Sequence, residues 1–170
     1  MSLFAPTFNN LRELYLNELR DLYSAETQLL EALPKMAEAA TSPALKQAFT
    51  SHLAETRGHA ERLQQIFDDL GVKATGETCA AMKGLIKEGE EYVKAGGDDH
   101  VRDAGLIGAA QRVEHYEMAG YGTTRSLALK LGQTIAAELL QATLDEEGAA
   151  DKKLTSIAES GVNDAASVSA

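Results

Sequence analysis

The sequence has little of what β-rich and nucleic-acid-binding proteins contain. Tryptophan is absent, aromatic residues make up 5% of the 170 residues, and there are only three prolines. Strands are enriched in aromatic and β-branched residues, so a chain rich in alanine and leucine favours long helices instead. Lysine and arginine number 16 against 26 aspartates and glutamates, and the formal net charge is -10. Because the basic residues form no block, we expect no nucleic-acid partner and no attraction to an anionic membrane.

Cysteine and long apolar runs are also scarce. Cys79 is the only cysteine and cannot form an internal disulfide, which fits a reducing compartment, so we expect a cytoplasmic protein. The first ten residues lack the basic and apolar segments of a signal peptide. No run of 18 apolar residues is present, which predicts that no segment spans a membrane. The length fits one domain, expected over residues 1–160, with a flexible tail over residues 161–170.

Apolar residues recur at steps of three and four in four long segments, which is the spacing of amphipathic helices. These segments run from about Asn9 to Ala40, Pro43 to Leu70, His100 to Leu131 and Gln133 to Ser160. A shorter helix is expected from about Glu77 to Lys94. Ser42 and Pro43 form a typical helix start, and Gly71 a typical stop. Pro34 is expected to kink or end the first helix near Leu33.

The lengths of the connections predict how these helices pack. Short turns join the first long helix to the second and the third to the fourth, so each pair should form an antiparallel hairpin. A long connection that carries the short helix joins the two hairpins. The predicted fold is therefore an all-α, ferritin-like four-helix bundle of two antiparallel hairpins with a long crossover.

Each long helix carries an acidic residue where its neighbours along the stripe are apolar. These residues are Glu26, Glu55, Glu114 and Glu147. One such glutamate is commonly a boundary residue that reaches water, but four of them at matched levels predict convergence inside the bundle. Buried, unpaired carboxylates cost several kcal/mol each, and the inner stripes contain no lysine or arginine. Two divalent cations would neutralise the four charges, and an oxygen-rich set with an imidazole favours iron or manganese.

Further candidates lie close to these acids on the same helices. Glu117 is expected to be a ligand or a neighbouring acid, and Asp151 follows Glu147 by four residues. The nitrogen ligand is left open between His59 and His52, although His52 fits a supporting or surface position better. His115 and Glu146, about 100° from the stripes, are expected at the surface or behind the ligands. The candidate metal ligands are Glu26, Glu55, His59, Glu114, Glu117, Glu147 and Asp151.

Four motifs resemble the YciE/YciF family of ferritin-like stress proteins over about residues 7–160. They are LRDLYSAETQLLEALPKMAEAA, HLAETRGHAERL, AAQRVEHYEMAGYGT and LLQATLDEEGAADKKL. The resemblance implies a ferritin-like bundle with an extra crossover helix, a dinuclear metal site and a homodimer. The wider carboxylate class carries Glu-x-x-His on two helices. Here Gly58 and Ala150 stand three residues after Glu55 and Glu147, and this departure leaves the nitrogen ligand and the activity open.

These observations predict a ferritin-like dinuclear-metal carboxylate protein of the bacterial stress response. It would bind two metal ions, iron before manganese or zinc, and handle iron, peroxide or oxygen. The alternative is a structural or metal-binding stress protein without turnover. The sequence contains no nucleophile elbow, phosphate loop or Cys-x-x-Cys pair that would indicate another chemistry.

Overall fold

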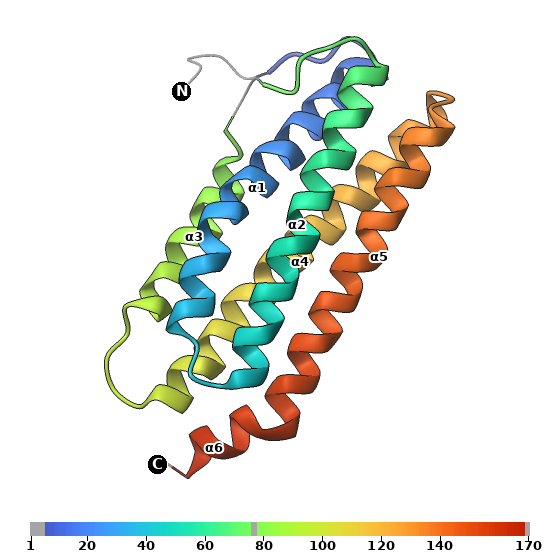
Figure 1. Cartoon of the computed structure of the whole chain (residues 1–170). Coiled ribbons are helices and arrows are strands. Elements are labelled where there is room, and N and C mark those ends of the chain that lie inside the picture. Colours follow the sequence, from blue (N-terminus) through green and yellow to red (C-terminus); the bar gives the residue numbers. More distant parts are fainter. Residues whose placement is uncertain (1–5, 76–77, 169–170) are drawn as a thin grey trace.

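Four long helices lie side by side in the computed structural model, which describes residues 6–75 and 78–168 (Figure 1). They are α1 (Leu11–Ala39), α2 (Pro43–Asp69), α4 (Asp99–Lys130) and α5 (Thr134–Ile157). The short helix α3 (Ala80–Val93) lies in the connection between α2 and α4. No strand occurs in the described ranges. The predicted all-α, ferritin-like bundle of two hairpins and a long crossover is confirmed.

The four long helices form a closed ring. Helix α1 packs against α2 and α4, and α5 packs against the same two helices. Each of these neighbours runs antiparallel to the next, and α3 covers the outside of α1 and α4 (Figure 1). A side chain that points inward from any of the four therefore meets side chains from the other three.

The helix ends follow the expected signals. The Asn10 side chain caps α1 by accepting from the backbone N–H of Glu13, and Ser42 caps α2 in the same way. Gly71 (φ 66°) and Gly132 (φ 73°) adopt the left-handed conformation after α2 and α4, which glycine tolerates best. Cys79 caps α3, whereas the predicted start of this helix at Glu77 lies outside the described residues.

Helix α1 continues past Pro34. The proline was expected to kink or end the helix near Leu33, and of these two outcomes the end does not occur, because α1 continues to Ala39. The proline removes one backbone hydrogen bond, but Leu33 and Met36 are buried around it, and their packing holds the helix in place.

Part of the expected C-terminal tail is helical. The segment η1 (Ala158–Val162) is kinked at Gly161 and leads into α6 (Asn163–Ser167), the last helix within the described residues. Val162 is 7% exposed and packs in the same cluster as Leu154 and Leu106. Burial of this one apolar side chain attaches the segment to the bundle.

The apolar interior consists of two clusters. One contains Leu29, Leu33, Phe49 and Leu106, and the other contains Leu19, Leu22, Leu63, Tyr121 and Leu140. The sequence positions of the predicted acids fall between these clusters on α1, α4 and α5. No helix in the described ranges is long and apolar enough to cross a bilayer.

Candidate metal centre

A layer of buried ionisable side chains separates the two apolar clusters. Helix α1 supplies Glu26, α2 supplies two histidines, α4 supplies two glutamates and α5 supplies Glu147. All are at most 6% exposed: Glu26, His52, His59, Glu114, Glu117 and Glu147. Five of the residues predicted from the sequence are thus brought together, and His52 joins them.

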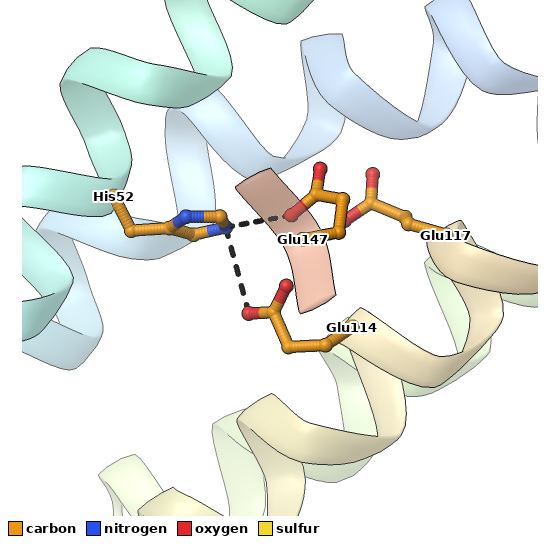
Figure 2. Close-up of side chains that lie close together, drawn as sticks. All are labelled: His52, Glu114, Glu117 and Glu147. Carbon is orange, nitrogen blue, oxygen red and sulfur yellow. Dashed lines mark ion pairs between the residues drawn. The ribbon is translucent and has the colours of Figure 1, made fainter. Parts of the chain in front are cut away.

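The first group, called here the His52 position, consists of His52, Glu114, Glu117 and Glu147 (Figure 2). Each residue offers one ligand atom, and these atoms lie within 4.8 Å of one another. His52 Nε2 lies 3.5 Å from Glu114 Oε1 and 3.6 Å from Glu147 Oε2. One nitrogen and several carboxylate oxygens therefore surround a common point, as ligands of a cation do.

The second group, called here the His59 position, consists of Glu26, His59 and Glu147. His59 Nδ1 lies 3.4 Å from Glu26 Oε1 and 3.0 Å from Glu147 Oε1. Tyr121 donates a hydrogen bond to Glu26 from the apolar side. Glu147 belongs to both groups and turns one oxygen toward each histidine, which is the arrangement of a carboxylate that bridges two cations.

A glutamate lies behind each histidine. His52 Nδ1 is 3.1 Å from Glu55 Oε2, and His59 Nε2 is 2.9 Å from Glu146 Oε2. When these ring nitrogens donate to the carboxylates, the opposite nitrogens are left free to bind a cation, as is usual for histidine ligands. Arg62 donates two hydrogen bonds to Glu146, at 2.6 and 2.8 Å, and so fixes the second pair.

The burial of so many acids shifts their proton affinities. Burial raises the pKa of Glu117 and of Glu114 well above the usual range, and the charge of Glu147 adds to both shifts. Burial also raises the pKa of Glu26, more than its contacts with His59 lower it. Burial lowers the pKa of His59, but Glu147 and Glu26 outweigh it and raise the value to about 10. Burial opposes ionisation of Glu147, yet His59 holds its pKa below the usual value.

The chemistry of these side chains fits bound cations. Buried polar atoms in proteins are almost always hydrogen-bonded, but several atoms of this layer make no hydrogen bond of good geometry. They are Glu26 Oε2, His52 Nε2, His59 Nδ1, Glu114 Oε2 and both carboxylate oxygens of Glu117 and Glu147. Two of them, His59 Nδ1 and Glu147 Oε1, contact each other as an ion pair at 3.0 Å. Four carboxylates can balance two divalent ions, and the set of oxygen and imidazole donors without a thiolate suits iron, manganese or zinc.

Two predicted ligands are not brought into either group. The side chain of Glu55 is 47% exposed and contacts the outer nitrogen of His52. The reason is helical phase: residues advance by about 100° along a helix, and Thr56, fully buried, takes the inward position instead. Asp151 is 19% exposed, and its Oδ1 lies 3.0 Å from Gln111 Nε2 and 3.3 Å from His115 Nε2.

His52 is the residue that the sequence interpretation underrated. It precedes His59 by seven residues, which is close to two helical turns and places both imidazoles on one face of α2. This spacing was the signal that both histidines point inward. Glu146, expected at the surface or behind the ligands, lies behind His59.

Comparison with known proteins gives consistent matches. A family model described as a domain of unknown function, DUF892, matches residues 10–167. The chain is 47% identical to the protein YciF of Escherichia coli strain K12 over 154 residues, which are 90% of this chain and 93% of YciF. The crystal structure of the E. coli stress protein YciF superposes with a TM-score of 0.88 at 46% identity, over 92% of this chain and 99% of YciF.

Two further structures are similar. YcfI from Rhodopseudomonas palustris gives a TM-score of 0.85 at 45% identity, over 90% of this chain and 98% of that one. The third match is a two-domain protein from Anabaena variabilis that contains DJ-1/ThiJ/PfpI-like and ferritin-like domains. It gives a TM-score of 0.59 at 17% identity, over 88% of this chain and 37% of that one. The last likeness shows the ferritin-like fold alone.

Proposed function

This chain belongs to the DUF892 family, and we propose that it binds two metal ions in the buried layer and uses them in a stress response. The observation that carries the proposal is the set of buried nitrogen and oxygen atoms without hydrogen-bond partners, which converge from α1, α2, α4 and α5. Leaving such groups unpaired costs about 1–3 kcal/mol each. Bound cations would supply the missing partners.

Each residue has a proposed role. His52, Glu114 and Glu117 would hold one ion, and Glu26 and His59 would hold the other. Glu147, which belongs to both groups, would serve both ions. The oxygen-rich donor set favours iron, with manganese and zinc as alternatives. In this arrangement Glu55 and Glu146 position the two imidazoles.

The proposed activity is the reduction of peroxide or oxygen. Two bound iron or manganese ions would supply the two electrons that, with two protons, convert one hydrogen peroxide to two waters. An external one-electron reductant would then have to return both ions to the M(II) state before a second cycle. The buried acids Glu114 and Glu117 can hold protons, because their pKa values are raised. The apolar clusters flank the layer on both sides. E. coli YciF is described as a stress protein, and we place this chain in the same setting.

The alternative is metal binding without turnover, in which the ions brace the bundle. One experiment separates the two. The purified protein is loaded with Fe(II) without oxygen, and the iron per chain is measured. Hydrogen peroxide consumption is then followed with excess ascorbate as the reductant, and the rate without protein is subtracted. Two ions per chain with repeated turnover support the proposed activity, two ions without turnover support the alternative, and no bound metal refutes both.

A matched pair of variants makes this test specific. Glu147→Gln keeps the shape of the bridging residue but removes its charge, and we expect it to lose metal binding. Glu138→Gln makes the same change at an exposed position of the same helix and should bind two ions. Equal metal binding by both variants would contradict the proposed site. The homodimer expected from the family resemblance stays a prediction, to be tested by the mass in solution.

A further inference from the structure

A pocket of about 120 Å³ reaches the His52 position. It opens between α2 and α5, and His52 and Glu114 are among the residues that line it. Small side chains, Ala48, Ala149 and Ala150, form much of its wall. A water molecule needs at least about 10–15 Å³ of cavity volume, so the pocket has room for several waters or for a small ligand of a few atoms.

The His59 position has no share in this pocket. Glu26 and His59 are both 0% exposed, and neither they nor Glu147 line it. On the outer side, Glu146 stands between His59 and the pocket: it lines the pocket, contacts His59 Nε2, and has both oxygens held by Arg62. On the inner side, Tyr121, also 0% exposed, donates to Glu26 and belongs to the apolar cluster.

We propose that the His52 position is the open, exchangeable one, where small ligands from solvent bind, and that the His59 position is closed. This rests on the proposed function, because it requires that both positions hold ions. A small ligand or a chelator can reach a bound ion only where the protein leaves an opening to solvent. This access, and not the number of protein ligands, separates the two positions, because the His52 position has four candidate ligands and the His59 position three. The pocket supplies such an opening at His52 and Glu114, and the ion pair of Arg62 with Glu146 denies it at His59.

The experiment measures how fast each ion leaves. The protein is loaded with two equivalents of Co(II), whose visible absorption reports the bound state, and excess EDTA is added. We expect loss of absorption in two phases of equal amplitude, with rates that differ by at least about tenfold, equivalent to about 1.4 kcal/mol in activation free energy. A single phase for both ions would overturn the proposal.

Two alanine variants on α5 test the role of the pocket. Ala149→Leu fills the pocket at an exposed rim position that tolerates leucine in a helix, and should slow the fast phase at least about fivefold while leaving the slow phase unchanged. Ala142→Leu makes the same change at an exposed position that does not line the pocket. It should leave both phases unchanged. Equal effects of the two variants on the fast phase would overturn the proposal.

A third variant and a small ligand show which phase of Co(II) loss belongs to the His52 position. His52→Ala should abolish the fast phase and keep the slow one. Azide added to the Co(II)-loaded protein should change the spectrum, and Ala149→Leu should slow this change, whereas Ala142→Leu should not. An azide response that is unaltered in Ala149→Leu would overturn the proposal. If the chain binds no Co(II) at all, the proposed function fails; if it binds two ions that exchange together, only this inference fails.

Discussion

Glu147 Oε1 lies 3.0 Å from His59 Nδ1 in the fully buried centre of the bundle. The other oxygen of the same carboxylate lies 3.6 Å from His52 Nε2. One side chain of α5 thus lies close to both imidazoles of α2, and these imidazoles are two helical turns apart. The polar layer is thereby divided into two positions that share Glu147 as a candidate ligand.

Removing bound metal should destabilise the protein. A ligand that binds only the folded state stabilises it by about 2.7 kcal/mol when present at 100 times its Kd. For a chain of this size about 1 kcal/mol corresponds to roughly 2–4 °C in Tm. We therefore expect a chelator to lower the Tm of the loaded protein by about 5–11 °C, measured by calorimetry. Glu147→Gln should show no chelator effect and Glu138→Gln the full one, and an unchanged Tm in the native chain would argue against bound metal.

Replacing Glu117 by methionine should stabilise the metal-free protein. Both of its carboxylate oxygens are buried without a hydrogen-bond partner, a cost of about 1–3 kcal/mol that an apolar side chain of similar length would not carry. We expect a gain of about that size in the free energy of unfolding by urea, together with weaker metal binding. A loss of stability in Glu117→Met without metal would show that the carboxylate has a structural partner.

Asp103 is also a buried acid, but replacing it should lower the free energy of unfolding, whereas replacing Glu117 should raise it. Its carboxylate accepts hydrogen bonds from the backbone N–H groups of Thr41 (2.9 Å) and Ser42 (2.6 Å) at the turn between α1 and α2. Asp103→Ala would leave these donors unsatisfied and should cost about 1–3 kcal/mol in unfolding free energy. Urea unfolding of the metal-free protein measures it. Metal stoichiometry should stay at two, since Asp103 belongs to neither position.

The glutamates behind the histidines should matter for affinity rather than for the number of ions. Loss of such a supporting carboxylate typically lowers metal affinity about 10–100-fold. We expect Glu55→Ala to weaken the His52 position by that factor, and Glu146→Ala to weaken the His59 position similarly. Glu55→Gln keeps an oxygen that can accept from His52 Nδ1 and should recover most of the affinity. Competition titration with a chromophoric chelator measures this, and a complete loss of one ion in Glu55→Gln would instead indicate that Glu55 is itself a ligand.

The metal-free protein should lose stability as the pH rises. Glu114 and Glu117 have raised pKa values in the folded state, so their contribution is present below the ordinary value of 4.5 and declines above it. The pKa of His59 is raised from 6.5 to about 10, so its contribution is complete below 6.5 and is lost as the pH rises through about 10. Because the pKa of Glu147 is lowered, this residue changes the stability with pH only below about 4.5. It therefore does not oppose the loss of stability with rising pH in neutral solution.

This pH dependence is tested by unfolding the protein at pH values from roughly 5 to 10, the range in which these raised pKa values should change the stability. We expect the free energy of unfolding to fall steadily without metal. With metal the fall should be smaller or reversed, because cations displace the protons and bind more tightly as the pH rises. Parallel curves with and without metal would contradict the assignment of these groups as ligands.

The sequence by itself determined the helices, their pairing and most of the acidic layer. Periodicity, caps and loop lengths are local properties, so the ends at Ser42 and Gly71 and the two hairpins could be predicted without coordinates. A glutamate within a leucine stripe is equally visible, and Glu26, Glu114, Glu117 and Glu147 were identified in this way. The local signal at Pro34 left open whether α1 ends there, and packing around the proline carries the helix on to Ala39. Composition likewise gave no sign that Val162, in the polar C-terminal segment, is buried.

Only the tertiary structure decided which side chains of α2 face the centre. Glu55, Thr56 and His52 lie within about 100° of one another around the helix, and the rotation of α2 against α1 and α5 selects among them. That rotation depends on how whole helix surfaces fit together, not on any short stretch of sequence. The same packing turned Glu147 toward both histidines, and it opened the pocket at His52 while closing the bundle around His59.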